Sequence, residues 1–373
     1  MINKQNRLDY LLTIKLLVSY NLCEWKRSAN VMPSYFLAFI TALIAVYALT
    51  PLVIKFAVKT GAMDKPDPRK VHKKPIPRLG GLAIYLAFMI AVCSMLDFSK
   101  EIVGLLLGGT FIVIVGIIDD FISLPAKVKL LGQILAACIL VAFDIRIDFI
   151  TDPFGDFIFL EYLAIPVTIF WIVGITNTVN LIDGLDGLAA GVSTIATVTI
   201  LLVALQSGDL PVVFLTAALA GASLGFLHYN FNPARIFMGD TGSMFLGYMF
   251  AAISVIGAVK SAATIALIVP ILALGLPILD TTFAIVRRYR GGVPIFKPDK
   301  GHLHHRLLAM GFSQRQAVLL MYVFSAFLGL AAIALTEVST SVAVMIVVFV
   351  AVIILFGAKK IGIFSMKNNA GTH

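Results

Sequence analysis

Apolar runs of about 20 residues recur along nearly the whole chain, and they limit what it can fold into. Such a run is long enough to cross the hydrocarbon core of a bilayer as one helix. Of the 373 residues, 60% are hydrophobic and 13% are charged, whereas roughly 25% are charged in a soluble domain. The sequence therefore predicts an all-α, polytopic membrane protein, a helical bundle with no separate soluble domain.

The lengths of the apolar runs predict eleven membrane spans. They lie at about 34–58, 79–96, 102–118, 128–143, 162–182, 188–206, 211–227, 244–259, 263–286, 317–335 and 341–357. The shortest runs extend into their flanks or lie beside irregular backbone. We divide the chain into an N-terminal extension (1–33), a transmembrane domain (34–357) and a C-terminal tail (358–373).

Five polar segments interrupt the apolar chain, and each follows an odd-numbered span, so alternation places all five on one face of the membrane. They are Lys65–Gly81, Asp119–Lys129, Asn177–Gly187, His228–Ser243 and Arg287–Arg306. Charged groups near membrane depth are costly, so a cluster of them marks a site. Many carboxylates and bases on one face indicate an enzyme with an active-site cleft there, acting on a charged head group.

The distribution of positive charge predicts which face this is. The loops on the side of the polar segments, together with the tail, carry 20 Lys and Arg, and the opposite loops carry 3. This bias places the polar segments and the C-terminus in the cytoplasm. The opposite loop at 144–163 is acidic, and its alternation near Asp156–Tyr162 predicts a small external hairpin.

The first 33 residues fit this topology poorly. Eleven spans with a cytoplasmic C-terminus place the N-terminus outside, yet this segment is basic. An interfacial helix, a signal-like segment and a translation start at Met32 are the alternatives, and we favour the last.

Asp119 and Asp120 end the third predicted span. Neighbouring side chains on a helix point about 100° apart, so we expect the two to differ in role. A solvated helix end is the simpler explanation, but acid pairs at membrane depth are costly without a function. We therefore predict a catalytic role for this pair.

The segment that begins at Asn177 is the most specific in the chain. Polar side chains recur every three residues at Asn177, Asn180, Asp183 and Asp186, which keeps successive groups adjacent on a helix. The glycines that follow allow the helix to end and a ligand to approach the backbone. Carboxamide and carboxylate oxygens suit a hard cation such as Mg²⁺. A helix cap explains one Asp and one Gly, but not four polar positions.

Asp240 lies just before the eighth predicted span. A carboxylate there either caps the new helix or binds a metal ion, and we predict the metal ligand. In that case Gly239 and Gly242 allow backbone N–H groups to point at a phosphate.

Three histidines, His302, His304 and His305, precede Arg306 in the longest polar loop. Three His within four residues suit a transition metal, but no cysteine lies nearby. Beside Arg and Lys, the imidazoles are better suited to clamp a diphosphate.

Several classes of protein are excluded by motifs that the sequence lacks. It has no phosphate-binding P-loop, dinucleotide fingerprint or zinc-protease motif. It also has no platform of basic and aromatic residues for nucleic acid. Its three cysteines are too few and too scattered for a disulfide framework or a metal cluster.

Four of the segments, in this order, resemble the polyprenyl-phosphate N-acetylhexosamine-1-phosphate transferases of glycosyltransferase family 4. They are Asp119–Asp120, Asn180-x-x-Asp183-Gly-x-Asp186-Gly-Leu, Gly239-Asp240-x-Gly242-Ser243 and His302-Leu-His304-His305-Arg306. The resemblance extends from about Met32 to the C-terminus. The branch that transfers phospho-MurNAc-pentapeptide typically has three consecutive histidines. Here Leu303 interrupts them, so the chain is more similar to the branch that transfers GlcNAc-1-phosphate.

This resemblance implies an enzyme that converts UDP-GlcNAc and undecaprenyl phosphate to undecaprenyl-diphospho-GlcNAc and UMP. It implies a requirement for Mg²⁺, with Mn²⁺ as a substitute, in the cytoplasmic membrane of a bacterium. The product would start a teichoic acid or an O-antigen type glycan of lipopolysaccharide. Besides the substrates, we expect membrane lipids as partners. A homodimer is also an expectation, although no specific feature of the sequence supports it.

The resemblance also implies roles for single residues. Asp240 would be the principal Mg²⁺ ligand and Asn180 a second, with Asp119 and Asp120 beside the reacting phosphates. The remaining positions would bind the nucleotide, the sugar or the diphosphate; they are Asn177, Asp183, Asp186, His302, His304, His305, Arg306 and one of Lys73 and Lys74.

Two mechanisms and two further functions stay open. The acceptor phosphate has a second pKa of about 6 and is largely dianionic at pH 7, so we expect direct attack on the sugar-linked phosphorus. Asp119 or Asp120 would orient or deprotonate the acceptor, and a covalent phospho-aspartate intermediate is the rival.

Another UDP-N-acetylhexosamine donor, or phospho-MurNAc-pentapeptide, is an alternative substrate. An ion-coupled transporter is a distant alternative, because the polar groups gather at one face rather than at the midplane.

Overall fold

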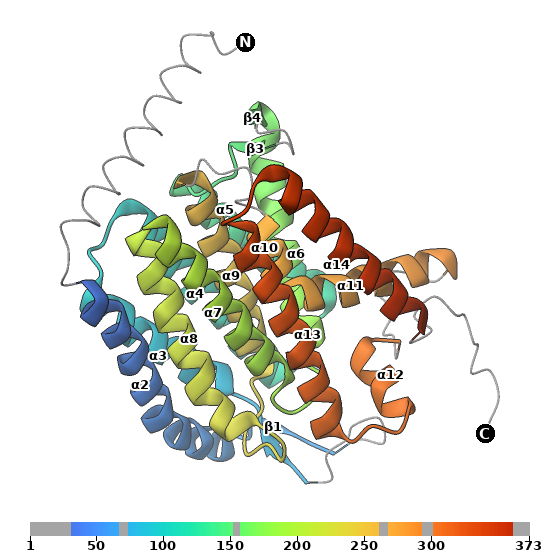
Figure 1. Ribbon diagram of the computed structural model, residues 1–373. Helices are drawn as coiled ribbons and strands as arrows, with labels where there is room; N and C mark the ends of the chain where they lie inside the picture. The colour runs from blue at the N-terminus through green and yellow to red at the C-terminus, as the bar shows by residue number, and fades with distance from the viewer. Residues whose placement is uncertain (1–30, 67–73, 152–156, 261–267, 293–300, 361–373) are drawn as a thin grey trace.

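The protein is almost entirely helical in the computed structural model, which describes residues 31–66, 74–151, 157–260, 268–292 and 301–360 (Figure 1). The helices are α2 (Val31–Thr60), α3 (Gly80–Met95), α4 (Lys100–Ile122), α5 (Ala126–Ala142), α6 (Ala164–Ile182), α7 (Leu188–Ser207), α8 (Leu210–Asn230), α9 (Gly239–Lys260), α10 (Ile268–Ala273), α11 (Gly275–Arg290), α12 (Leu303–Ala309), α13 (Gln314–Leu335) and α14 (Thr340–Lys360). Two antiparallel hairpins pair β1 (Met63–Asp64) with β2 (Ile76–Pro77), and β3 (Phe149–Thr151) with β4 (Phe157–Phe159). The predicted all-α membrane bundle is confirmed.

Eight helices within the described ranges are long and apolar enough to cross a membrane. They are Ser34–Thr60, Lys100–Ile122, Glu161–Ile182, Leu188–Ser207, Leu210–Asn230, Gly239–Gly257, Gln314–Leu335 and Ser341–Lys360. The apolar helix α3 is shorter, with 16 residues. The count of eleven spans therefore stays a prediction. Most of the N-terminal extension (1–30) and of the tail (361–373) lies outside the described residues.

The predicted ninth span (263–286) is divided between two helices in the part that the structure describes. Helix α10 ends at Ala273 and α11 begins at Gly275. Pro277 accounts for the break, because it has no N–H to donate to the carbonyl of Ala273 and its ring clashes there. Residues 261–267 lie outside the described ranges.

The two ends of the bundle differ in structure. Figure 1 shows β1 and α12 at one end and the β3–β4 hairpin at the opposite end. The predicted small hairpin is confirmed, with Phe149 opposite Phe159 and Thr151 opposite Phe157. Its place is therefore the end away from the histidine helix, α12.

Helix α9 lies at the centre of the bundle. It packs against α3, α4 and α6, and its large side chains Phe245, Tyr248 and Phe250 are fully buried. The first turn of α3 is joined to the chain before α9, since Gly81 N donates to Met238 O at 2.8 Å. The first residues of α9 are thus held from several sides, which fixes the polar groups that they carry.

Gly81 gives a direct test of this packing. A Cβ at Gly81 would lie 2.0 Å from the backbone nitrogen of Gly242, and backbone cannot move aside as a flexible side chain can. We expect Gly81→Ala to destabilise the protein by about 1–3 kcal/mol, as overpacked cores do. Gly174→Ala on α6 is the matched control, because nothing lies within 4 Å of its added Cβ. Thermal unfolding in detergent measures both, and equal midpoints would contradict the close packing of α3 on α9.

Candidate active site

Asp120 anchors the start of α9. Its carboxylate accepts hydrogen bonds from the backbone nitrogens of Asp240 (3.0 Å) and Thr241 (3.1 Å) and from Thr241 Oγ1 (2.6 Å). Its Oδ1 also accepts hydrogen bonds from Arg78 Nε at 3.1 Å and from Arg78 Nη2 at 3.0 Å. The Asp120 side chain is fully buried. A carboxylate has about four acceptor sites, so protein donors already satisfy Asp120 and leave it no capacity for a ligand.

Asp119 faces a different set of groups. Its Oδ1 accepts from Leu124 N at 2.6 Å, and its Oδ2 lies 3.1 Å from Lys129 Nζ. The same ammonium lies 2.8 Å from Oδ2 of Asp240. Two carboxylates from α4 and α9 thus converge on one cation that α5 supplies.

Asn180 and Asp183 lie at the end of α6. Neither side chain has a hydrogen bond to the described residues, and both are partly buried. Burial, with added repulsion from Asp120 and Asp186, raises the pKa of Asp183 to about 7, although Arg78 opposes the rise. Asp183 therefore belongs to the same acidic neighbourhood as Asp120, and a cation placed there would favour its charged form.

Asp186 holds the loop that leads to Asp240. Its Oδ2 accepts from Asn232 Nδ2 and from Ala234 N, both at 3.0 Å. Asn230 Oδ1 in turn accepts from Gly187 N at 3.0 Å. These hydrogen bonds hold the turn after α6 against the loop before α9, so the polar residues of the two segments lie close together.

Asn177 is placed apart from these acids. It forms a reciprocal amide pair with Gln133 of α5, with Nδ2 2.5 Å from Gln133 Oε1 and Oδ1 3.2 Å from Gln133 Nε2. The pair joins α5 to α6. Of the first-loop lysines, Lys74 is exposed, and Lys73 lies outside the described residues.

The histidines of α12 differ in environment. His304 is 2% exposed, and a Cβ at Gly184 would lie 2.6 Å from its Nε2, so this ring packs against the turn next to Asp183. Burial, and then the neighbouring His305, lowers the pKa of His304 to about 3, so the ring is neutral at pH 7. Its Nδ1 has no hydrogen-bond partner among the described residues. Because His304 carries no charge, other residues must supply the positive charge in this part of the site.

Arg306 carries the fixed positive charge in this part of the site. His302 Nδ1 lies 2.9 Å from Asp280 Oδ2. Arg306 donates from Nε to the carbonyl of Gly301 at 3.1 Å. His305 lies beside His304, with ring centroids 4.2 Å apart.

Sequence reasoning missed three of these groups as site residues. Arg78 and Lys129 were interpreted only as part of the excess of positive charge on the cytoplasmic side, although each contacts a predicted acid. Asp280 stood unremarked inside a predicted span. A carboxylate in an apolar run is itself a signal, because burying it alone is costly.

Comparison with known proteins places these residues in a family. A family model described as glycosyl transferase family 4 matches residues 102–258, which contain Asp119, Asp183 and Asp240. A Bacillus subtilis protein named probable undecaprenyl-phosphate N-acetylglucosaminyl 1-phosphate transferase is 43% identical over 88% of this chain and 93% of its own length. This chain belongs to glycosyl transferase family 4.

More distant members of the family have related names. A decaprenyl-phosphate N-acetylglucosaminephosphotransferase of Mycobacterium leprae is 36% identical over 81% of this chain and 84% of its own. An undecaprenyl-phosphate alpha-N-acetylglucosaminyl 1-phosphate transferase of Salmonella typhi is 27% identical over 78% of this chain and 82% of its own. The resemblance to the polyprenyl-phosphate transferases of glycosyl transferase family 4, first seen in four short motifs, is thus confirmed over most of the chain.

Proposed function

We propose that this protein transfers GlcNAc-1-phosphate from UDP-GlcNAc to undecaprenyl phosphate, giving undecaprenyl-diphospho-GlcNAc and UMP. The observation that carries the proposal is the convergence of Asp119 and Asp240 on one cation at the end of a membrane bundle. The printed names of the Bacillus and Salmonella relatives support the donor and the acceptor. The mycobacterial relatives are named for decaprenyl phosphate, so members of the family differ in the lipid for which they are named.

Two anionic substrates have to meet in this reaction, so positive charge must screen them. Catalysis of phosphoryl transfer is mostly positioning and charge stabilisation. Lys129 and Arg78 supply fixed cations beside the acids, and Arg306 supplies one from α12. Asp183 and Asp186 would face the nucleotide, and His304 would pack against the donor sugar.

The acidic groups fit Mg²⁺. This ion keeps several waters and is usually held by one or two carboxylates together with substrate phosphates. Asp240 would hold Mg²⁺, with Asn180 as a second oxygen ligand, and Asp119, which shares Lys129 Nζ with Asp240, would lie beside the reacting phosphates. When bound, the ion would neutralise charge on the two phosphate groups and on the departing UMP.

The protein would promote direct attack by the lipid phosphate. An oxygen of that phosphate forms a bond to the sugar-linked phosphorus of UDP-GlcNAc, and the bond from this phosphorus to the oxygen of UMP breaks. Asp119 is the member of the acidic pair that can orient the acceptor, because Asp120 is saturated by protein donors. In the rival mechanism, a phospho-aspartate enzyme would accumulate without acceptor and could be trapped with labelled donor.

The site would face the cytoplasm of a bacterium from its inner membrane. The positive-inside bias supports this orientation, because 20 Lys and Arg lie on the side of the polar segments and 3 on the other. The product would then be made on the cytoplasmic face and would serve as the lipid primer of a surface glycan. A homodimer stays a proposal to be tested by the mass of the purified protein.

Measuring UMP release by the purified full chain with undecaprenyl phosphate and Mg²⁺ tests this function. The donors to compare are UDP-GlcNAc, UDP-GalNAc and UDP-MurNAc-pentapeptide. We expect release with UDP-GlcNAc alone, loss of release with EDTA, and its recovery with added Mg²⁺ or Mn²⁺. Release only with UDP-MurNAc-pentapeptide would assign the chain to the other branch. If none of the three donors gave UMP release, the proposal would be contradicted. Proton-driven uptake of substrate into proteoliposomes would then favour a transporter.

A further inference from the structure

Asp280 is a buried carboxylate that lines a mostly apolar pocket. It lies on α11 and is 6% exposed. A buried carboxylate is costly unless charged or hydrogen-bonded partners compensate it. Both of its oxygens are engaged by one short segment, the start of α12.

The two oxygens hold different parts of that segment. Oδ1 accepts from Leu303 N at 2.8 Å, which satisfies one of the N–H groups left open at the start of a helix. Oδ2 lies 2.9 Å from His302 Nδ1. The backbone contact fixes where α12 begins, and the ring contact fixes the orientation of the imidazole and the nitrogen that carries the proton.

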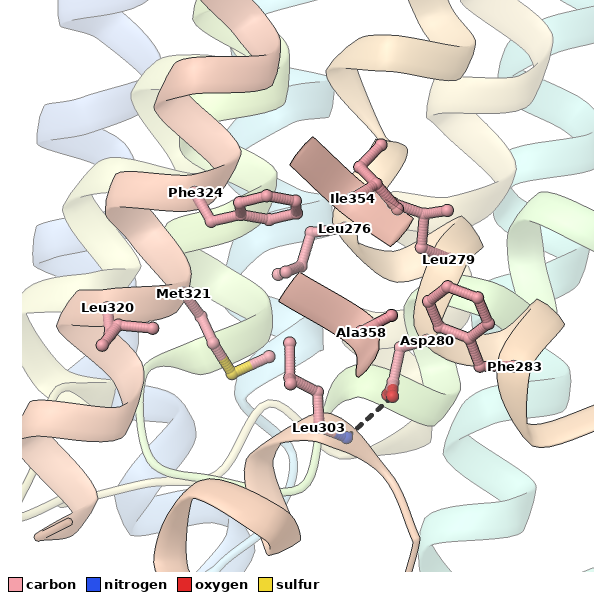
Figure 2. Close-up of a pocket in the computed structure, with 10 residues that line it drawn as sticks. All are labelled: Leu276, Leu279, Asp280, Phe283, Leu303, Leu320, Met321, Phe324, Ile354 and Ala358. Atoms are coloured by element: carbon pink, nitrogen blue, oxygen red, sulfur yellow. Dashed lines mark hydrogen bonds between the residues drawn. The ribbon is translucent and has the colours of Figure 1, made fainter. Parts of the chain in front are cut away.

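The surroundings strengthen this pair. Figure 2 shows Asp280 as the polar member of an otherwise apolar pocket, with its dashed hydrogen bond to Leu303. The cavity has a volume of about 100 Å³ and lies between α11, α12, α13 and α14, where Leu276, Phe283 and Phe324 line it. His302 itself is 6% exposed. Water competes poorly for a hydrogen bond in such a place, so the pair is stronger than it would be in solution.

The pair is also connected to the acidic groups of the site. The rings of His302 and His304 are nearly parallel, with centroids 5.9 Å apart. His304 packs against Gly184, next to Asp183. A change in the position of the His302 ring would therefore alter the packing of His304 against the turn that carries Asp183.

We propose that Asp280 is a positioning residue that acts through His302, holding Nδ1 so that Nε2 is the nitrogen left for contact with the substrates. This inference rests on the proposed function. Asp280 itself contacts no substrate in this account, and its effect on the reaction passes entirely through the orientation of one imidazole.

A double-mutant cycle separates this role from a merely structural one. Asp280→Asn keeps an oxygen for Leu303 N but removes the charge that holds His302. We expect it to lower kcat/KM for UDP-GlcNAc by about 10–100-fold, as the loss of a supporting carboxylate typically does. In a His302→Ala background, Asp280→Asn should then have almost no further effect, because the residue it acts on is gone. Losses that multiply in the double variant, or a fully active Asp280→Asn, would overturn the proposal.

Two further measurements guard against loss of stability and against failure of the proposed function. Ser254→Ala removes a buried hydrogen bond from Trp171 Nε1 far from α12, so it should keep kcat/KM while costing stability. Carbethoxylation of His302 by diethyl pyrocarbonate, followed by mass spectrometry, needs no activity. We expect Asp280→Asn to raise its rate several-fold, since the ring is released. An unchanged rate would overturn the positioning role even if the wild-type protein released no UMP.

Discussion

Replacing Asp240 or Asp119 by Asn is expected to lower the rate of UMP release on the order of 10³-fold while the protein stays folded. Each change removes one of the two negative charges that meet at Lys129 and, in the proposed reaction, lie at Mg²⁺ and beside the reacting phosphates. Asparagine keeps the size of the side chain and an oxygen that accepts a hydrogen bond. The loss should therefore fall on charge stabilisation rather than on packing.

The two variants should also be non-additive. Because both carboxylates act on the same cation, the double variant should be little worse than either single one. Asp144→Asn is the matched control, since Asp144 is exposed, lies between α5 and β3 in the chain, and pairs with Lys100. It should leave the rate unchanged. An Asp240→Asn enzyme with normal activity would remove this residue from the site.

Asp120→Asn should fail in a different way, by losing stability. Its carboxylate is the acceptor for Arg78 and for both nitrogens at the start of α9. An amide in its place turns an N–H₂ group toward donors and removes the nearer of the two carboxylates beside Arg78, since Asp64 Oδ1 lies 3.9 Å from Nη1. Removing one partner of a buried ion pair typically costs about 3–5 kcal/mol, and Arg78 is only 23% exposed in its side chain.

Thermal unfolding in detergent, compared for Asp119→Asn, Asp120→Asn and Asp144→Asn, checks this difference. We expect a clear fall in the midpoint for Asp120→Asn alone among the three. A stable but inactive Asp120→Asn protein would assign Asp120 to the chemistry instead of to the anchoring of α9. The two neighbouring acids would then share the role that we propose for Asp119.

The sequence predicted the helices well because the signal is local. A run of about 20 apolar residues has few alternatives to a helix in a bilayer, since each backbone group must be paired within the segment. The ninth span shows that run length does not predict a break within a span. Its apolar character continues, but Pro277 has no N–H to bond the carbonyl of Ala273, so the regular helix is interrupted there. Reading the proline first would have predicted the division into α10 and α11.

The site was predicted in outline, but the partners of its residues were not. The angle between neighbours on a helix predicted that Asp119 and Asp120 would differ. Which of the two is free for a ligand depends on Arg78, Lys129 and Thr241, which lie far away in the sequence. Asp280 was missed for the same reason, because its partner His302 follows 22 residues later across a break in the helices.

Transfer of the sugar together with its phosphate is the central claim, and a labelled donor tests it most directly. UDP-GlcNAc carrying ³²P in the sugar-linked phosphate is incubated with the purified protein, Mg²⁺ and undecaprenyl phosphate, and the lipid and nucleotide fractions are separated. We predict that the label moves to the lipid, whose mass becomes that of undecaprenyl-diphospho-GlcNAc, while unlabelled UMP is released. Label that stays in the nucleotide fraction as UDP, with the sugar alone on the lipid, would contradict the account.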